Sequence, residues 1–285
     1  MSDTPSLPSV AVYGLGIIGS RAADHIAAAG YPLRTWSRSP RERDDFEAGP
    51  VAAAASAEII ALYLKDVSAV RDIFGQIRGS LTAEKTIVNH ATIDHATTEF
   101  LVEECAKLGC DFLNCPFTGS KVAAGNGALV YYVGGNSEVL ERMRPYLETT
   151  SSQIMEVASP AAATVLKLTT NLITASTVQA LAEGLRLNLA HGISAETYLA
   201  SIKPNACASV LANMKVPSMA AGDFDPHFSL SNMLKDARYM LDLADRAGVQ
   251  TPGIATTAEQ MQKRNDAGEG EQDFSVLFRQ FEANA

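Results

Sequence analysis

The sequence of 285 residues contains little cysteine, little basic charge and no long apolar run. Its four cysteines form no C-x-x-C pair and have no histidine at metal-ligand spacing, so we expect no metal site and a reduced, cytoplasmic protein. No uninterrupted apolar segment approaches the roughly 18 residues of a membrane span, and residues 1–9 lack the features of a signal peptide. The formal net charge of −9 argues against a general role on nucleic acid or on a membrane surface.

The chain does have the composition of a globular protein, with 47% hydrophobic and 19% charged residues. Its length suffices for one large or two medium domains. The periodicity changes near residue 158, where alternating strand and helix patterns give way to helices alone. We therefore expect a flexible tail over 1–9, an α/β domain with a mostly parallel sheet over 10–158, and an all-helical domain over 159–285.

The most informative segment runs from Val10 to Gly19 and reads VAVYGLGIIG. An apolar stretch with strand character leads into G-x-G-x-x-G, and a helix-like stretch follows, which are the surroundings that a dinucleotide-binding turn requires. The first glycine permits the tight turn, the second lets the backbone approach a pyrophosphate, and the third lets helix pack on strand. The alternative is a chance glycine turn. The residues that we expect to bind the cofactor here are Gly14, Leu15, Gly16, Ile17, Ile18 and Gly19.

The next predicted strand, Tyr31 to Trp36, indicates which dinucleotide binds. An NAD-specific fold places Asp or Glu at the end of this strand, for the ribose 2′-hydroxyl. This chain has Ser37, Arg38 and Ser39 instead, and a guanidinium can hold a 2′-phosphate. We therefore expect NADPH; the alternative is a solvated basic turn.

Strand and helix patterns alternate through the rest of the first domain, as a parallel sheet requires. Continuous apolar runs, typical of strands buried on both faces, occupy residues 59–64 and 86–89. The remaining predicted strands are 111–115, 127–135 and 153–157, and the predicted helices are 66–74, 94–108 and 137–147.

From Pro160 to Leu189 apolar residues recur at three- and four-residue spacing without a proline, and Ser159 is a good N-cap. This pattern predicts a helix of about thirty residues, which we expect to be the spine of the helical domain. Further helices are predicted at 194–202, 206–214, 229–247, 251–266 and 274–281. Because no low-complexity linker separates the domains, we expect the site to lie between them.

Lys167 is the first candidate for chemistry. It lies two turns into the long helix, and Asn171 follows at i+4 on the same face. The neighbouring residues are otherwise small or apolar, and a lysine that loses solvation has a lowered pKa and becomes a usable general acid. The alternative is an ordinary surface lysine on an amphipathic helix.

Two other polar segments stand out. The loop from Asn114 to Lys121 follows a strand, at the edge where open α/β sheets bind ligands, and its hydroxyls and N–H groups could hold a carboxylate. The alternative is a Ser/Gly turn. Lys235 and Asp236 follow Phe228 and precede a helix pattern; on their own they indicate a surface ion pair.

Together these motifs resemble the β-hydroxyacid dehydrogenase family, and specifically its glyoxylate and succinic semialdehyde reductase branch. They occur in the family's order over essentially the whole chain, and Pro116 to Lys121 corresponds to the family's Pro-Val-Ser-Gly substrate loop. The resemblance implies that Lys167 and Asn171 are catalytic, that Thr118, Gly119 and Ser120 hold a carboxylate, and that Phe228 and Asp236 belong to the substrate pocket. It also implies further cofactor contacts from Leu64, Lys65, Thr92 and Lys235.

Five positions depart from the family pattern. Ala161 and Ala163 stand where members have the glycines of Gly-x-Gly, and Ala91 replaces a serine. Phe117 replaces a smaller valine and Thr118 replaces the substrate-binding serine, although the hydroxyl is kept. Substrate identity is therefore the part of the resemblance that these changes affect most.

The resemblance implies NADPH-dependent reduction of a small aldehyde acid, such as glyoxylate or succinic semialdehyde, with Lys167 protonating the developing alkoxide. It also implies a homodimer. One alternative is an imine reductase on the same scaffold, although such enzymes usually lack the lysine. The other is a non-catalytic NADP-binding protein.

Overall fold

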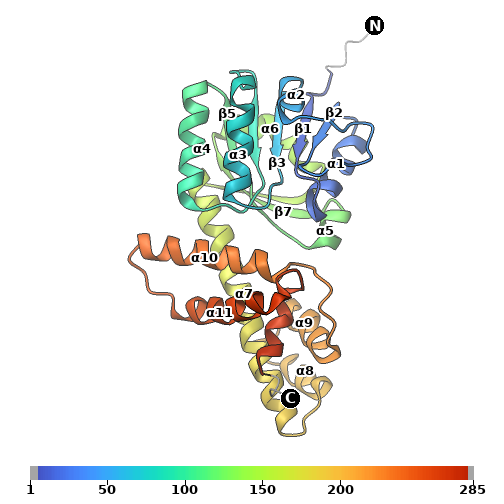
Figure 1. The fold of residues 1–285 in the computed structure, drawn as a ribbon, viewed down its shortest axis with the longest axis vertical. Helices are drawn as coiled ribbons and strands as arrows, with labels where there is room; N and C mark the ends of the chain where they lie inside the picture. Colours follow the sequence, from blue (N-terminus) through green and yellow to red (C-terminus); the bar gives the residue numbers. More distant parts are fainter. Residues whose placement is uncertain (1–5, 282–285) are drawn as a thin grey trace. The chain divides into compact units, whose positions relative to one another are not determined.

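The computed structural model describes residues 6–281 and divides into two compact units. The first unit runs through Lys167 and contains the sheet; the second begins at Leu168 and is helical (Figure 1). The predicted fold class, a mostly parallel Rossmann-type sheet followed by a helical domain, is confirmed.

The sheet has eight strands, in the order β2-β1-β3-β4-β5-β7-β6, and β8 pairs with β7. Strands β1 to β5 run parallel to one another, whereas β7 runs antiparallel to β5 and β6. The strands are β1 (Val10–Tyr13), β2 (Leu33–Trp36), β3 (Ile59–Leu62), β4 (Thr86–Asn89), β5 (Asp111–Asn114), β6 (Phe117–Thr118), β7 (Leu129–Gly135) and β8 (Ser151–Val157).

The helices follow in chain order. Those before the long helix are α1 (Ile17–Ala28), α2 (Pro50–Ala55), α3 (Val67–Ile77), the 3-10 turn η1 (Arg78–Ser80), α4 (His95–Leu108), α5 (Lys121–Gly125) and α6 (Ser137–Glu148). The later ones are α7 (Pro160–Ala190), α8 (Ala195–Ile202), α9 (Val210–Ala221), α10 (Leu230–Arg246), α11 (Pro252–Arg264), the π turn η2 (Asn265–Glu269) and the 3-10 helix η3 (Phe274–Phe281).

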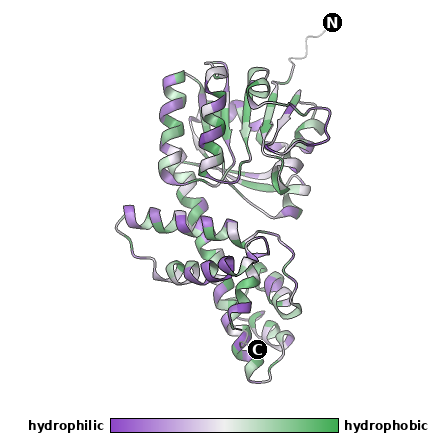
Figure 2. Cartoon of the chain, in the orientation of Figure 1, coloured by the Kyte–Doolittle hydropathy of each residue, from purple (hydrophilic) through white to green (hydrophobic). Residues whose placement is uncertain are grey.

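Side chains that alternate along the strands build one core on each face of the sheet. Val10 and Val12 of β1 pack in the cluster that also holds side chains of α1 and α6. Ala11 and Tyr13 point the other way, into the cluster that holds side chains of α2, α3 and α4. Strands covered on both faces need continuous apolar sequence, which explains the unbroken runs in β1 and β3 and their hydrophobic colour in Figure 2.

Helix starts in the first unit follow local chemistry. Asp66 and Asp94 cap α3 and α4 by accepting hydrogen bonds from the N–H groups of Ala69 and Thr97, at 2.9 and 2.7 Å. The predicted N-cap of the long helix is also confirmed, because Ser159 Oγ accepts from Ala162 N at 3.1 Å. The helix spans 31 residues.

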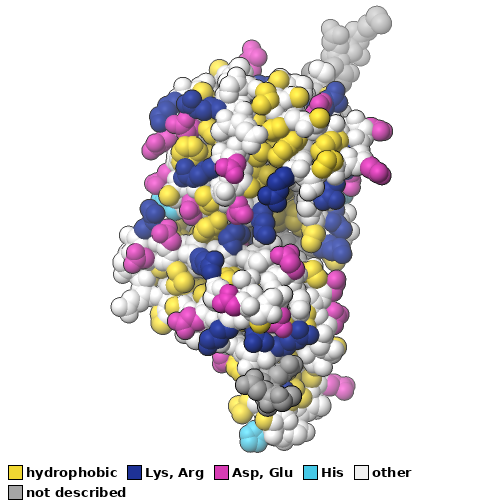
Figure 3. Space-filling view, in the orientation of Figure 1, with side chains coloured by type: hydrophobic (Ala, Val, Ile, Leu, Met, Phe, Trp, Pro, Cys, Tyr) yellow, Lys and Arg dark blue, Asp and Glu magenta, His cyan; other side chains and the backbone are white. Residues whose placement is uncertain are grey.

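The helical unit has its own core. Leucines, valines and alanines of α7 pack in one cluster with apolar residues of α9, α10, α11 and η3. On the face drawn in Figure 3, acidic and basic side chains are interspersed over both units. Among the described residues, none of the helices combines the length and apolar character needed to cross a membrane.

Three local predictions differ from the structure. The helix expected at 206–214 is α9, which begins only at Val210 because Ser209 accepts from Ala212 N and caps it there. The Pro-Phe-Thr-Gly-Ser-Lys segment is not a loop throughout, since it contributes β6 and the start of α5. Helix α2 was not predicted.

The expected flexible tail covers residues 1–9. Residues 1–5 lie outside the described residues, and Ser9 N donates to the Glu58 carboxylate at 3.0 Å.

Candidate active site

The glycine-rich turn connects β1 to α1 and has the geometry that its sequence predicts. Gly14 has a φ of +98°, and a Cβ there would lie 2.3 Å from the carbonyl oxygen of Tyr63. A Cβ at Gly19 would lie 1.9 Å from the carbonyl oxygen of Gly14, so α1 packs closely against the turn only because position 19 is glycine. These two glycines are therefore required by the fold itself.

Gly16 is different, because a Cβ there would meet no described atom within 4 Å. This position is also the N-cap of α1 and offers no side chain to the first N–H groups of the helix. Ile17, the next residue, is 45% exposed, whereas Leu15 is buried. An open glycine beside an uncapped helix N-terminus fits a pyrophosphate, which would use both the space and the N–H groups. The residues present thus fit a dinucleotide.

The turn after β2 holds the predicted 2′-phosphate residues. Ser37 Oγ donates to the carbonyl oxygen of Ser39 at 2.6 Å, and the Arg38 side chain is exposed. Arg43, five residues further on, is engaged by the carboxylates of Asp24 and Asp45 at 2.7 and 2.9 Å. Arg38 is therefore the better placed of these two arginines to meet a ligand.

Asp45 is an acid that lies against the preceding strand, where Thr35 Oγ1 donates to its carboxylate at 2.8 Å. Burial opposes its ionisation, but hydrogen bonds from Arg43 and Thr35 and the positive charge of Arg43 outweigh burial and lower its pKa. Arg43 binds both oxygens of this carboxylate, and the backbone carbonyl oxygen of Asp45 accepts from Thr35 N of β2. The carboxylate therefore holds the segment 37–45 against β2.

The remaining cofactor candidates follow the next two strands. Leu64 and Lys65 follow β3, and a Cβ at Gly14 would lie 3.4 Å from Leu64 Cδ2, so Leu64 borders the glycine-rich turn. Lys65 is exposed. Thr92 follows β4 and is partly exposed, beside the buried Ala91. These residues lie at the carboxyl ends of parallel strands, where open α/β sheets bind ligands.

The predicted carboxylate-binding residues do not share one loop. Thr118 ends β6 and pairs with Val130 of β7, and Ser120 caps α5 by accepting from Ala123 N at 3.5 Å. Between them Gly119 has a φ of +138°, and a Cβ there would lie 2.8 Å from Leu129 Cδ2. The glycine is thus required by both conformation and space, and it turns the chain between the two hydroxyls.

Lys167 and Asn171 lie one turn apart on α7, and both are buried, with 9% and 8% exposure. Burial removes the alternative of an ordinary surface lysine.

Asp236 connects two of the predicted residues. Asn171 Nδ2 donates to Asp236 Oδ2 at 2.7 Å, and Lys235 Nζ donates to Asp236 Oδ1 at 2.7 Å. Asp236 is fully buried and both of its oxygens are engaged by these two side chains, while its place in the substrate pocket stays a prediction. Its geometry suits a residue that orients Asn171 and Lys235.

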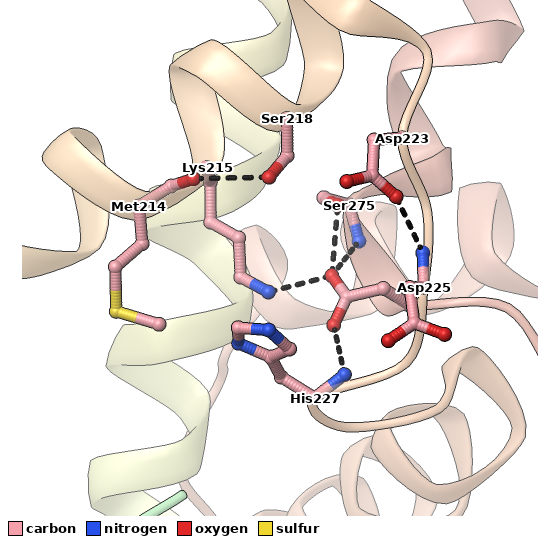
Figure 4. Close-up of a pocket in the computed structure, with 8 residues that line it drawn as sticks. Met214, Lys215, Ser218, Asp223, Asp225, His227 and Ser275 are labelled. Carbon is pink, nitrogen blue, oxygen red and sulfur yellow. Dashed lines mark hydrogen bonds and ion pairs between the residues drawn. The ribbon is translucent and has the colours of Figure 1, made fainter. Parts of the chain in front are cut away.

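Phe228 is presented by the segment before α10. Its ring packs edge-on against Phe274 at a centroid distance of 6.4 Å, and its backbone N–H donates to Asp273 Oδ2 at 3.2 Å. The Asp273 carboxylate is also bound by Lys215, His227 and Ser275. In Figure 4, dashed lines lead from these three labelled residues to one unlabelled carboxylate.

Asp273 and Lys215 line a small cavity of about 90 Å³ in the helical unit. Burial opposes ionisation of Asp273, but the charge of Lys215 and the hydrogen bonds outweigh it and lower the Asp273 pKa. The sequence analysis gave no role to Asp273. Its only sequence signal is a lone acid directly before the apolar stretch of η3.

The sequence analysis also missed a group of buried polar side chains in the first unit. His90 is fully buried, stacks on Tyr63 at 4.3 Å, and its Nδ1 lies 3.0 Å from the carbonyl oxygen of Cys115. Burial lowers the pKa of His90 to about 3, so the ring is neutral at physiological pH. A polar residue directly after a buried strand is the signal that could have drawn attention to it.

Within residues 6–281, no three His, Cys, Asp or Glu side chains are placed to hold a metal ion.

Two family models match nearly the whole described chain. A model described as the NAD-binding domain of 6-phosphogluconate dehydrogenase matches residues 9–159. A second, described as the NAD-binding part of NADP-dependent 3-hydroxyisobutyrate dehydrogenase, matches residues 161–281. The chain belongs to the β-hydroxyacid dehydrogenase family. The predicted family and enzyme class, an NAD(P)-dependent oxidoreductase, are confirmed, and the cofactor is a nicotinamide dinucleotide.

Individual relatives agree with this assignment. Glyoxylate/succinic semialdehyde reductase 1 of Arabidopsis thaliana is 27% identical over 278 residues, which are 94% of this chain and 96% of the reductase. The structure of 3-hydroxyisobutyrate dehydrogenase from Mycobacterium tuberculosis with L-serine is similar in fold, with a TM-score of 0.89 at 23% identity, covering 97% of this chain and all of that one. An imine reductase from Pseudomonas sp. is less similar, with a TM-score of 0.61 at 22% identity over 96% of this chain and 99% of that one.

Proposed function

We propose that this enzyme reduces a small aldehyde acid, of the glyoxylate or succinic semialdehyde type, to the hydroxy acid, with NADPH as the reductant. The observation that carries the proposal is a buried lysine, Lys167, one helical turn before a buried asparagine whose amide is held by Asp236. A nicotinamide cofactor, when bound, supplies the hydride. Lys167 Nζ donates the proton that the carbonyl oxygen takes up as it gains negative charge.

The other residues bind and orient. The hydroxyls of Thr118 and Ser120 and the N–H groups around Gly119 hold the substrate carboxylate, and Phe228 covers an apolar part of the substrate. Asn171 orients the carbonyl, because Asp236 holds its amide in one position. Preorganised donors of this kind stabilise developing charge without reorganising during the reaction.

NADPH is proposed over NADH because of the turn after β2. The exposed Arg38, flanked by Ser37 and Ser39, provides donors for a 2′-phosphate, and the carboxylate of Asp45 is occupied by Arg43. The N–H groups that follow Gly16 would hold the pyrophosphate, while Leu64, Lys65, Thr92 and Lys235 complete the cofactor site.

A homodimer in the cytoplasm is part of the same proposal. Ile173 and Leu187 of α7 are both 63% exposed and Val210 of α9 is 76% exposed, which leaves apolar surface for a second copy. All four cysteines are free, as in a reducing compartment. Sedimentation equilibrium measures the oligomeric state directly.

The proposal is tested by measuring NADPH consumption with glyoxylate, succinic semialdehyde, tartronate semialdehyde and a set of cyclic imines, with NADH in parallel. We expect turnover with at least one aldehyde acid, a higher kcat/KM for NADPH than for NADH, and little activity on imines. Activity on imines alone would establish the imine reductase alternative. Binding of NADPH without turnover of any substrate would favour a non-catalytic protein, and equal use of NADH would refute the role of Arg38.

A further inference from the structure

Two buried asparagines end neighbouring strands of the sheet. Asn89 and Asn114 are the last residues of β4 and β5, and both are fully buried. Asn89 Nδ2 donates to Asn114 Oδ1 at 2.8 Å and to the carbonyl oxygen of Ala91 at 3.0 Å, while Asn89 Oδ1 accepts from Ala91 N at 3.2 Å. The Asn89 amide therefore fixes the turn that carries Thr92, the next residue.

The Asn114 amide continues this chain of hydrogen bonds to the start of α7. Its Nδ2 donates to the carbonyl oxygen of Pro160 at 2.8 Å and to Thr164 Oγ1 at 2.9 Å. Thr164 is buried, and its hydroxyl oxygen lies 2.7 Å from Thr98 Oγ1. Because the Thr98 hydroxyl donates to the carbonyl oxygen of Asp94 at 3.1 Å, the Thr164 hydroxyl donates to Thr98.

All donors and acceptors of these two amides are satisfied, so the chain has one favoured arrangement. It joins the ends of β4 and β5 to the first turns of α7, all within the first unit. Lys167 is three residues after Thr164, on the next turn of the same helix, so a rotation of this turn would displace the lysine amine.

We propose that Asn114, acting through Thr164, is a positioning residue for Lys167. The inference rests on the proposed role of Lys167 as general acid. Neither Asn114 nor Thr164 takes part in the chemistry. Together they fix the rotation of α7 about its axis and its position along that axis at the turn that carries Lys167. Misplacement of a reacting group by about 1 Å can cost on the order of a hundredfold in rate, so a single lost hydroxyl in this chain has a measurable effect.

Three variants separate positioning from general stabilisation. Thr164→Val keeps the shape and removes the hydroxyl, whereas Thr164→Ser keeps the hydroxyl and removes a methyl group. Thr150→Val is the matched control, because Thr150 is a buried threonine of the same unit whose hydroxyl lies 2.8 Å from that of Tyr131.

At a temperature where all variants are folded, we expect Thr164→Val to lower kcat about tenfold with little change in the KM for NADPH. Thr164→Ser should stay within about threefold of the wild type and Thr150→Val within about twofold. A Thr164→Val enzyme with a kcat near that of the wild type, or no more affected than Thr150→Val, would overturn the proposal. Should Thr164→Val fail to fold, Thr98→Val removes the next hydroxyl in the chain, and an unchanged kcat there would overturn it equally.

A second readout does not depend on any substrate. The reactivity of the Lys167 amine toward acetic anhydride, measured across pH by mass spectrometry, reports its ionisation and exposure. We expect the pH profile of Lys167 to shift in Thr164→Val and to stay unchanged in Thr150→Val. If the wild type reduces no aldehyde acid, the proposed function fails while this measurement still decides the positioning role; an unchanged profile in Thr164→Val refutes it.

Discussion

The helical unit holds two lysine–aspartate pairs of nearly equal ion-pair distance. Lys215 Nζ lies 2.6 Å from Asp273 Oδ1, and Lys235 Nζ lies 2.7 Å from Asp236 Oδ1. The two aspartates are buried alike, with 3% and 0% of their side chains exposed. The lysines differ, because the Lys215 side chain is 6% exposed and that of Lys235 is 17% exposed.

The partners of the second carboxylate oxygen show what each pair does. Asp273 Oδ2 accepts from the backbone N–H groups of His227 and Phe228, so this pair fixes the course of the chain. Asp236 Oδ2 accepts from the side-chain amide of Asn171, which is one turn after Lys167. The same two residue types thus serve the fold in one place and the candidate site in the other, and the difference lies in what else the carboxylate binds.

The largest expected effect comes from removing the lysine of the more deeply buried pair. Lys215→Met leaves the Asp273 carboxylate buried without its counter-charge, which costs about 3–5 kcal/mol of the free energy of unfolding. Lys235→Met, the matched variant, should cost less, because Asp236 keeps its bond to Asn171 and the Lys235 side chain is more exposed. Urea denaturation of both variants measures the contrast. Equal losses of stability would mean that the two pairs serve the fold equally.

The next effect concerns catalysis. Asp236→Asn removes the charge that holds Lys235 and loosens the Asn171 amide, so we expect kcat to fall about 10- to 100-fold. Asp273→Asn should lower stability while leaving kcat of the folded enzyme within about threefold of the wild type. Steady-state kinetics and thermal melts on both variants test this. The comparison fails if Asp273→Asn lowers kcat as much as Asp236→Asn does.

The last prediction concerns the pH dependence of stability. The Asp273 pKa is lowered on folding, so the contribution of its charge to stability is present at neutral pH and is lost only as the pH falls below the ordinary aspartate value of 3.8. The pKa of His90, by contrast, falls from 6.5 to about 3 on folding. Between pH 6.5 and about 3 the unfolded state therefore binds one more proton than the folded state, and the free energy of unfolding decreases by about 1.4 kcal/mol for each pH unit within that range.

Because His90 lies in the first unit and Asp273 in the second, the two pH ranges report on the stability of different units. The single tryptophan of the sequence, Trp36, lies in β2 of the first unit, so its fluorescence follows the unfolding of that unit. Urea titrations between pH 4 and 7 should show that the free energy of unfolding falls with decreasing pH in the wild type and in Asp273→Asn. In His90→Gln the free energy of unfolding should change less with pH. An unchanged slope in His90→Gln would show that His90 does not cause it.

Much of the fold was predictable because its signals are local. The apolar runs that became β3 and β4, and the caps Asp66, Asp94 and Ser159, act within a few residues of themselves. Helix α2 was missed because its sequence, PVAAAA, has no apolar periodicity. The strand β6 was missed for another reason: two residues form a strand only because β7 is there to pair with them.

The candidate site divides in the same way. The glycine turn and the Lys167–Asn171 pair follow from spacing along the chain, so sequence patterns predict them. The hydrogen bond from Asn171 to Asp236 could not be predicted, because it joins residues 65 positions apart. The Asn89–Asn114 amide pair joins residues 25 positions apart on separate strands, and it becomes visible only when the register of β4 and β5 is known.

Lys167 is proposed to donate the proton in the reduction. The most direct test is the kcat of Lys167→Ala with NADPH and the best aldehyde acid, together with the Kd for NADPH and the exposed-lysine control Lys203→Ala. We expect kcat to fall about 10²- to 10⁴-fold in Lys167→Ala while NADPH binding stays within about twofold and Lys203→Ala behaves as the wild type. A Lys167→Ala enzyme that turns over at a rate near that of the wild type would contradict the account.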